Sequence, residues 1–214
     1  MKLEAILLLG PTGSGKTPLG DHLEKALLWN RRCYHFDFGA NLRAVVAGGE
    51  AGSFTAEEVR FLRRVLEEGV LLESEHSPLA ARILDAFIAR KAVRAADFLV
   101  LNGLPRHLEQ AKSMESKVTV ISVVQLDCDA HTVAERLRRN SGGDRAQRAD
   151  DAEALVARKL AIYKNRTRPL LDHYRSQGVC ILKVPVGIKT QLAEMAGQLA
   201  TLLPPVVLQR SGKI

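Results

Sequence analysis

The chain has 214 residues, of which 46% are hydrophobic and 26% are charged, a balance that excludes a disordered or fibrous protein. This length suffices for one well-buried α/β domain with small lobes and is short for two domains. The formal net charge of +7 suits a phosphate-rich partner, but it does not distinguish a nucleotide from a nucleic acid.

The cysteines and the N-terminus exclude further classes. Cys33, Cys128 and Cys180 are isolated and form no C-x-x-C pair, so neither a zinc site nor a disulfide framework is expected. The apolar run at the N-terminus is short, contains Glu4 and leads into a glycine-rich loop rather than a cleavage site. No other run approaches the ~18 apolar residues of a membrane span. We therefore expect a cytoplasmic protein with reduced cysteines.

In chain order, the predicted elements alternate between strands and helices. Short apolar or β-branched runs predict strands, and amphipathic stretches predict helices, one of them opened by the capping-box pair Thr55 and Glu58. The predicted strands are 3–9, 32–36, 98–101, 119–126 and 179–184. The predicted helices are 16–29, 55–68, 78–95, 130–139, 151–176 and 189–203. This alternation predicts a five-stranded parallel sheet between two layers of helices.

One motif lies between the first strand and the first helix. The run G-P-T-G-S-G-K-T at 10–17 matches G-x-x-x-x-G-K-[ST] in the required strand–helix context. Its glycines let several backbone N–H groups point at one anion, and the helix N-terminus adds its positive dipole end. Lys16 is expected to reach the β- and γ-phosphates, and the Thr17 hydroxyl to join the shell of Mg²⁺. The predicted residues that bind ATP are Gly10, Pro11, Thr12, Gly13, Ser14, Gly15, Lys16 and Thr17.

Three further motifs follow in order. They read H-F-D-F-G-A-N-L-R at 35–43, N-G-L-P-R at 102–106 with a glutamine at 110, and E-R-L-R-R at 135–139. With the phosphate loop, they resemble adenylate kinase and the related nucleoside monophosphate kinases over most of the chain. The resemblance implies a single P-loop kinase domain over 1–214, with a helical monophosphate-binding insert at about 36–72 and a short lid at about 140–149.

The resemblance also implies roles for individual residues. Arg43 and Arg106 would clamp the acceptor phosphate, Gln110 would read the acceptor base, and Arg136 would lie against the donor nucleotide. Arginine suits these places because its planar fork binds phosphate bidentately and keeps its charge. The implied substrate-binding residues are Phe38, Gly39, Arg43, Leu72, Gly103, Arg106 and Gln110. The implied catalytic residues are Lys16, Arg106, Arg136, Arg148 and Lys159.

The chain also departs from the family pattern at several places. Phe38 stands beside the acceptor base where the family has Thr, Ser or Ala, and would fill space or offer a stacking face. Asp37 replaces a small residue, so adenine selectivity is in doubt. Asn102 replaces the aspartate that helps hold the hydrated Mg²⁺, which predicts a weaker metal site because an amide brings no charge. Lys159 replaces an arginine and loses its bidentate fork, and Asn140 replaces a second lid arginine.

These observations favour an enzyme that transfers the γ-phosphate of ATP to a nucleoside monophosphate with the help of Mg²⁺. One alternative keeps the chemistry and changes the acceptor to another small molecule, because fold alone does not choose. Another is a degenerate family member that binds nucleotides with little turnover. Nucleic acid is not an expected partner, since no basic stripe is interleaved with aromatic residues. We expect a monomer.

Overall fold

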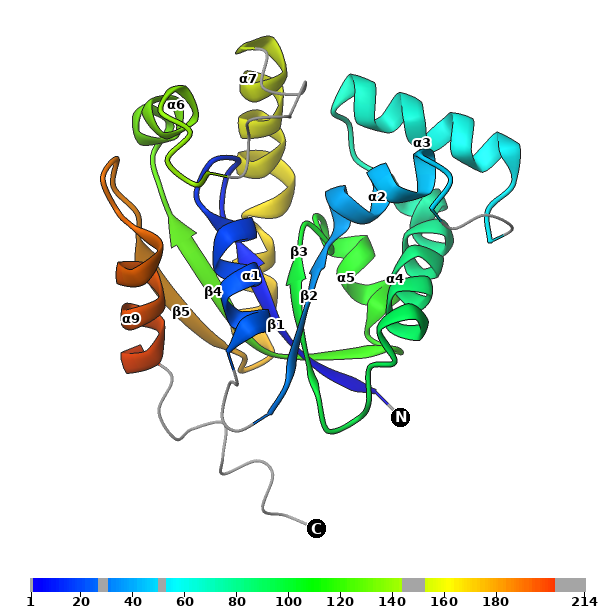
Figure 1. The fold of residues 1–214 in the computed structure, drawn as a ribbon, viewed down its shortest axis with the longest axis horizontal. Coiled ribbons are helices and arrows are strands. Elements are labelled where there is room, and N and C mark those ends of the chain that lie inside the picture. Colours follow the sequence, from blue (N-terminus) through cyan, green and yellow to red (C-terminus); the bar gives the residue numbers. More distant parts are fainter. Residues whose placement is uncertain (1, 27–30, 50–52, 144–152, 203–214) are drawn as a thin grey trace.

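The computed structural model describes residues 2–26, 31–49, 53–143 and 153–202. It confirms the predicted α/β fold: five parallel strands form one sheet in the order β2-β3-β1-β4-β5 (Figure 1). The strands are β1 (Leu3–Leu9), β2 (Cys33–Asp37), β3 (Phe98–Asn102), β4 (Val118–Asp127) and β5 (Cys180–Pro185). Each lies within one or two residues of its predicted range.

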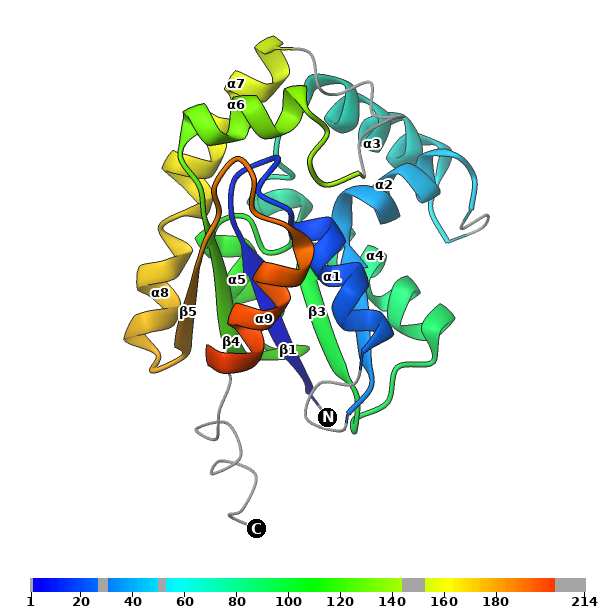
Figure 2. The same cartoon turned by 60° about the vertical axis from the view of Figure 1, so that its left-hand side comes forward.

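Helices cover both faces of the sheet, as the alternating pattern requires. The helical elements are α1 (Lys16–Lys25), α2 (Phe38–Val46), α3 (Ala56–Glu68), η1 (Ser74–His76), α4 (Ser77–Lys91), α5 (Leu108–Met114), α6 (Ala130–Arg138), α7 (Glu153–Ile162), η3 (Tyr163–Thr167), α8 (Leu170–Ser176) and α9 (Leu192–Leu202). Helices α1 and α9 pack on one face, and α4, α5 and α8 pack on the other (Figure 2).

The central strand β1 shows why its sequence is a continuous apolar run. Ala5, Ile6 and Leu7 are completely buried, and successive side chains enter opposite cores. Ile6 packs in the core beneath α1 and α9, while Ala5 and Leu7 pack in the larger core on the other face. A strand buried on both faces needs apolar residues at every position, not at alternate ones.

Strand register places particular residues at the upper edge of the sheet. β2 pairs with β3 so that Asp37 lies opposite Asn102, and β3 pairs with β1 so that Asn102 lies opposite Leu8. These positions are at the carboxyl ends of the strands, where ligands bind in open α/β sheets. Loops following β1, β2 and β3 therefore meet at one place, between α2–α3 on one side and α6–α7 on the other (Figure 1).

The structure changes two features of the predicted helices. The single helix predicted over 151–176 is instead three elements, α7, the π-helical turn η3 and α8. Pro169 lies at the start of α8 and lacks the N–H that a continuous helix would need, so the break follows from its chemistry. Helix α5 was not predicted, because its seven residues are too few for a clear period. The capping box at Thr55 and Glu58 is confirmed.

The two predicted lobes are described unequally. Residues 38–46 and 56–68 of the predicted insert form α2 and α3, which pack against each other. Most of the predicted lid, residues 144–149, lies outside the described residues. Residues 140–143 follow α6, and Asn140 and Gly143 adopt left-handed backbone conformations with φ of 47° and 68°. In the described part of the chain, no helix is both long and apolar enough to cross a membrane.

Candidate active site

One pocket opens at the carboxyl edge of the sheet. Residues from the loop after β1, the starts of α2 and α5, the end of α3, and helices α6 and α7 line it. Every described residue of the predicted site contacts this pocket except Pro11 and Ser14, which are buried within the phosphate loop. Arg148 lies outside the described residues. The fold therefore brings together motifs that lie far apart in the sequence.

The loop from Gly10 to Gly15 has the geometry of an anion site. Gly13 and Gly15 have φ of 76° and 99°, conformations that favour glycine. A Cβ atom at Gly10 would lie 2.7 Å from the Ser14 hydroxyl and 2.9 Å from the Leu126 carbonyl oxygen, so the loop leaves no room for a side chain there. Helix α1 begins directly after the loop, at Lys16. Exposed N–H groups at a helix start, in a glycine-rich turn, fit the phosphates of a nucleotide.

Lys16 lies over this loop. Its Nζ donates to the carbonyl oxygens of Gly10 and Pro11 at 2.8 Å and 2.7 Å. These bonds hold the ammonium group at the mouth of the loop, where it also contacts the pocket. An ammonium ion at this place adds a positive charge to the anion site that the backbone N–H groups form.

Three polar side chains meet beside the first turn of α1. The Thr17 hydroxyl donates to Asp37 Oδ2 at 2.7 Å, and Asn102 Nδ2 donates to the same carboxylate oxygen at 3.0 Å. Asn102 Nδ2 also lies 3.1 Å from Thr17 Oγ1. The other oxygen, Asp37 Oδ1, accepts from the Ala40 N–H at 2.9 Å and caps α2. The hydroxyl and carboxylate oxygens here are ligands that suit Mg²⁺.

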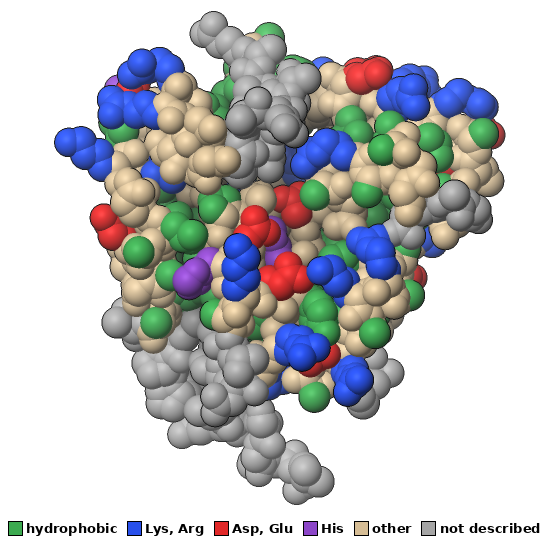
Figure 3. All heavy atoms as spheres, in the orientation of Figure 1, with side chains coloured by type: hydrophobic (Ala, Val, Ile, Leu, Met, Phe, Trp, Pro, Cys, Tyr) green, Lys and Arg blue, Asp and Glu red, His purple; other side chains and the backbone are tan. Residues whose placement is uncertain are grey.

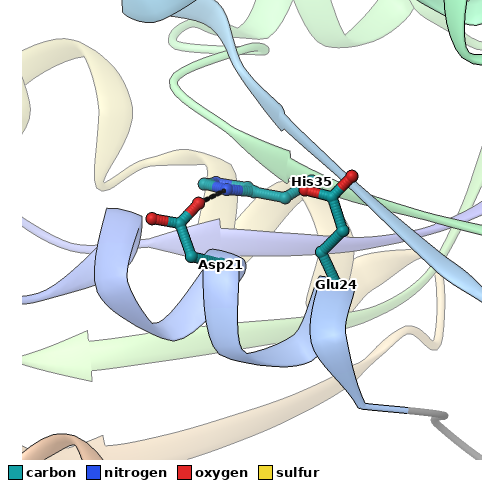
Figure 4. A group of neighbouring side chains, drawn as sticks. All are labelled: Asp21, Glu24 and His35. Atoms are coloured by element: carbon teal, nitrogen blue, oxygen red, sulfur yellow. Dashed lines mark hydrogen bonds and ion pairs between the residues drawn. The ribbon is translucent and has the colours of Figure 1, made fainter.

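A buried histidine lies behind this cluster. His35 Nδ1 lies 2.8 Å from Asp21 Oδ1 on α1 (Figure 4). On the other side of the ring, His35 Nε2 lies 3.4 Å from Asn102 Nδ2. In the tautomer with the proton on Nδ1, the ring donates to the Asp21 carboxylate, and Nε2 can accept from the Asn102 amide. Gly20 makes room for the ring, because a Cβ atom there would lie 2.3 Å from two of its atoms.

Asp21, Glu24 and His35 also have the spacing of a metal site, since one ligand atom from each lies within 4.8 Å of the others. Each already has a protein partner: Asp21 pairs with His35, and Glu24 forms an ion pair with Lys91 at 3.0 Å. Asp21 and Glu24 both project from α1, and the Asp21 carboxylate turns toward the imidazole ring (Figure 4). We interpret the group as support for the histidine.

Arg106 lines the same pocket as the phosphate loop. Its backbone is held at both ends: the N–H donates to Gln110 Oε1 at 2.8 Å, and the carbonyl accepts from the Thr167 hydroxyl at 2.8 Å. Burial lowers the pKa of its guanidinium group to about 10, which leaves the group charged at neutral pH. Among the described residues, no side chain or carbonyl forms a hydrogen bond or ion pair with this guanidinium group. A partly desolvated cation without a partner fits an anionic ligand.

Gln110 and Leu72 make bonds that the sequence did not reveal. Gln110 Nε2 donates to the Leu72 carbonyl oxygen at 2.8 Å, and His107 Nε2 lies 3.0 Å from the same oxygen. Gln110 is 2% exposed, and both ends of its amide bind backbone. A carbonyl oxygen has two lone pairs, so the Leu72 oxygen is already saturated. The amide therefore holds Arg106 and Leu72 in place.

Phe38, Gly39 and Arg43 line the neighbouring wall on α2. Phe38 is only 4% exposed, and its ring centroid lies 6.1 Å from that of Phe36, so it fills space and offers no open stacking face. The Arg43 side chain passes over Gly39, where a Cβ atom would lie 3.4 Å from Arg43 Nη1. Arg43 is exposed, and its guanidinium group bonds to none of the residues that the structure describes. Gly103, with φ of 83°, lets its loop approach Phe38.

Arg136 is buried within the protein. Its Nε donates to the Gly13 carbonyl at 3.1 Å, and its Nη1 donates to the carbonyls of Gly187 and Thr190, each at 2.9 Å. The side chain is 2% exposed and contacts the pocket. These bonds join the phosphate loop to the segment after β5, so Arg136 holds the loop in place.

Helix α7 supplies the remaining wall. Lys159 passes beside Gly69, where a Cβ atom would lie 3.7 Å from Lys159 Cε, and Arg158 Nη1 donates to the Glu68 carbonyl at 3.1 Å. Tyr163 and Thr167 of η3 also line the pocket and were not predicted. The π-helical turn that presents them leaves no mark in the sequence, although such turns are common at functional sites.

Basic side chains gather on helices at either side of the pocket. Lys and Arg side chains gather over α6 on one side and over α2 and α3 on the other (Figure 3). Exposed arginines here are Arg138 of α6, Arg139 at its C-terminal cap, and Arg60, Arg63 and Arg64 of α3. Such a field raises the local concentration of an anionic ligand.

Comparisons with known proteins agree with this geometry. The family model for adenylate kinase matches residues 8–179. The adenylate kinase of Xanthomonas campestris pv. campestris (strain 8004) is 30% identical over 199 residues, which cover 90% of this chain and 97% of that protein. The adenylate kinase of Parvibaculum lavamentivorans is 30% identical over 211 residues, which cover 92% and 91%. A solved gluconokinase from Sinorhizobium meliloti covers both chains fully with a TM-score of 0.53 and 19% identity, a likeness of fold alone.

Proposed function

Because this chain belongs to the adenylate kinase family, we propose that it transfers the γ-phosphate of ATP to a nucleoside monophosphate. The observation that carries the proposal is Arg106, a partly desolvated cation that lines the same pocket as the phosphate loop and whose guanidinium group has no partner among the described residues. Such a group is stabilised when an anion enters. Arg43 adds a second guanidinium group on the same side of the pocket.

Transfer between two phosphates requires little covalent chemistry from a protein. It requires the donor and acceptor in line and positive charge around the transferred group. The loop from Gly10 to Gly15 and Lys16 would hold the donor, and Arg43 and Arg106 would hold the acceptor phosphate. Mg²⁺, when bound, would neutralise charge on the donor phosphates, and the Thr17 hydroxyl would be one of its ligands.

The acceptor base is expected to be read weakly. Adenine recognition needs polar groups that pair with its edge, because a site that leaves a buried polar group unpaired rejects the wrong base. Here the Leu72 oxygen already accepts two bonds, the Gln110 amide binds backbone at both ends, and Phe38 fills space. The phosphate clamp remains intact, so we propose phosphorylation of several monophosphates, with AMP turnover below that of an ordinary adenylate kinase.

A screen of acceptors tests this function. ATP and Mg²⁺ would be incubated with AMP, GMP, CMP, UMP or dTMP, and ADP formation would be measured for the unmodified protein and for Arg106→Ala. Arg175→Ala removes an exposed arginine that pairs with Asp172 and serves as the matched control. We expect ADP only when a monophosphate is present, with the rate lost in Arg106→Ala alone. Tight ATP binding with no turnover of any monophosphate would indicate a different acceptor or a binding protein.

A further inference from the structure

We propose that Asp37 supplies the carboxylate that helps hold the nucleotide-bound Mg²⁺, in place of the residue at 102. This inference rests on the proposed function, since it concerns the metal that accompanies ATP. The family resemblance assigns the carboxylate to the end of β3, where this chain has Asn102. In the structure, the carboxylate comes from the end of the neighbouring strand β2.

The register of the sheet makes this exchange possible. Asp37 and Asn102 lie opposite each other at the carboxyl ends of β2 and β3. Their side chains both reach the first turn of α1, where Asp37 Oδ2 lies 2.7 Å from Thr17 Oγ1 and 3.0 Å from Asn102 Nδ2. A carboxylate beside the hydroxyl of the phosphate loop, on a strand end, is the arrangement by which P-loop proteins hold their metal.

Helix capping alone does not account for Asp37. Its Oδ1 atom accepts from the Ala40 N–H and satisfies the start of α2, a task that serine or asparagine performs equally well. Its Oδ2 atom points the other way, to Thr17 and Asn102. The cap therefore uses only Oδ1. A cation at Oδ2 would take the place of one of its two hydrogen bonds, and the side chain lines the pocket.

The amide at 102 follows from the carboxylate at 37. Two carboxylates whose oxygens lie about 3 Å apart would repel each other, and one of them would take up a proton. The Asn102 amide instead donates to Asp37 Oδ2, and it also lies 3.4 Å from Nε2 of His35. When the His35 proton is on Nδ1, beside Asp21, Nε2 can accept a hydrogen bond from the Asn102 amide, and this bond orients the amide. One negative charge is kept at this edge and moved by one strand.

Metal-dependent binding of ATP tests the inference without any acceptor. The dissociation constant of ATP would be measured by calorimetry in Mg²⁺ and in EDTA, for the unmodified protein and for Asp37→Asn, Asn102→Asp and the double variant. Asparagine retains the cap of α2, and binding in EDTA reports an intact phosphate loop. Asp129→Asn is the matched control, because Asp129 caps α6 through the Thr132 N–H at 2.7 Å and lies outside the pocket.

Mg²⁺ is expected to lower the dissociation constant of ATP, and we expect this effect to be about 10- to 100-fold smaller in Asp37→Asn. In EDTA, Asp37→Asn should bind ATP as tightly as the unmodified protein or more tightly. Asp129→Asn should bind as the unmodified protein does. The double variant, with the carboxylate returned to β3, should recover most of the Mg²⁺ effect, and Asn102→Asp alone should not exceed the unmodified protein.

If Mg²⁺ tightens ATP binding in Asp37→Asn as much as in the unmodified protein, the inference is wrong. The same result is expected if Asp37 serves only to accept a proton from an alcohol acceptor. Failure of every monophosphate in the acceptor screen would overturn the proposed function and leave this result standing. An unmodified protein whose ATP binding does not respond to Mg²⁺ would overturn both.

Discussion

The donor and acceptor sides of the pocket are built by different means. On the donor side, consecutive residues from Gly10 to Thr17 form the site, and most of its geometry belongs to the backbone: two left-handed glycines and a helix start. On the proposed acceptor side, single side chains arrive from α2, from the loop after β3 and from α5. A site made by local backbone is readable from a short motif. A site made by side chains from distant segments changes by substitutions that compensate one another in space.

The largest effect is expected on the donor side. Lys16→Ala removes the ammonium group at the mouth of the loop and should lower turnover on the order of 10³-fold, while weakening ATP binding. Steady-state kinetics and calorimetry measure both. Lys112→Ala, which removes an exposed lysine paired with Glu109 on α5, is the control. Near-normal turnover in Lys16→Ala would show that the backbone alone makes the donor site.

Arg106→Ala tests whether the acceptor side has its own phosphate clamp. Loss of one charged phosphate contact should cost about 2–4 kcal/mol, or roughly 30- to 900-fold in kcat/KM for the acceptor. ATP affinity should change little, because the phosphate loop is intact. Arg175→Ala should leave both parameters unchanged. An equal loss of kcat/KM for the acceptor and of affinity for ATP would mean that Arg106 does not act on the acceptor alone.

Gly20→Ala tests the contact where the two sides meet. Alanine in the interior of a helix normally stabilises a protein relative to glycine, by about 1 kcal/mol. At Gly20 the added methyl group would collide with the buried His35 ring, so we expect a net loss of about 1–3 kcal/mol and a lower Tm. Gly197→Ala in α9 has nothing within 4 Å of the added atom and should raise the Tm. A stabilised Gly20→Ala would show that the ring moves freely.

The smallest effect is expected at Phe38. Phe38→Thr opens space beside the acceptor base and should shift preference towards AMP, by less than about tenfold. Phe38 is buried, so the variant also loses about 2–4 kcal/mol of stability and should be assayed well below its Tm. Phe38→Leu keeps an apolar group and serves as the control. The ratio of kcat/KM values across the five monophosphates is the measurement, and an unmodified protein that is fast and strictly AMP-specific would contradict this role for Phe38.

The sequence predicted what depends on local pattern. Burial on both faces explains why β1 was recognised from its apolar run, and the capping box located the start of α3 because both partners lie within one turn. The break before α8 could also be predicted, because Pro169 signals the end of a helix. The helical pattern on both sides of Pro169 instead favours one continuous helix. The turn η3 has no such signal.

The relations between distant side chains were not predictable. Asn102 alone predicts a weakened metal site. The sequence does not reveal that a carboxylate oxygen, Asp37 Oδ2, lies 3.0 Å from Asn102 Nδ2. The sequence does not reveal that the Gln110 amide bonds to Arg106 and Leu72. It also does not reveal that the Arg136 side chain bonds to three backbone carbonyls. Each case requires the register of the sheet or the path of a loop.

The bonds of Arg136 have a consequence for biosynthesis. The phosphate loop lies at residues 10–17, but the preceding strand β1 gains both of its neighbours only after β4 ends at Asp127. The Arg136 guanidinium group, which bonds to Gly13, can bond to the carbonyls of Gly187 and Thr190 only after those residues are made. Because ribosomes release the chain from its N-terminus at about 5–20 residues per second, the earliest motif to leave the ribosome is among the last to acquire all its contacts. A nascent chain thus completes the contacts of its phosphate loop only after Thr190 has been made.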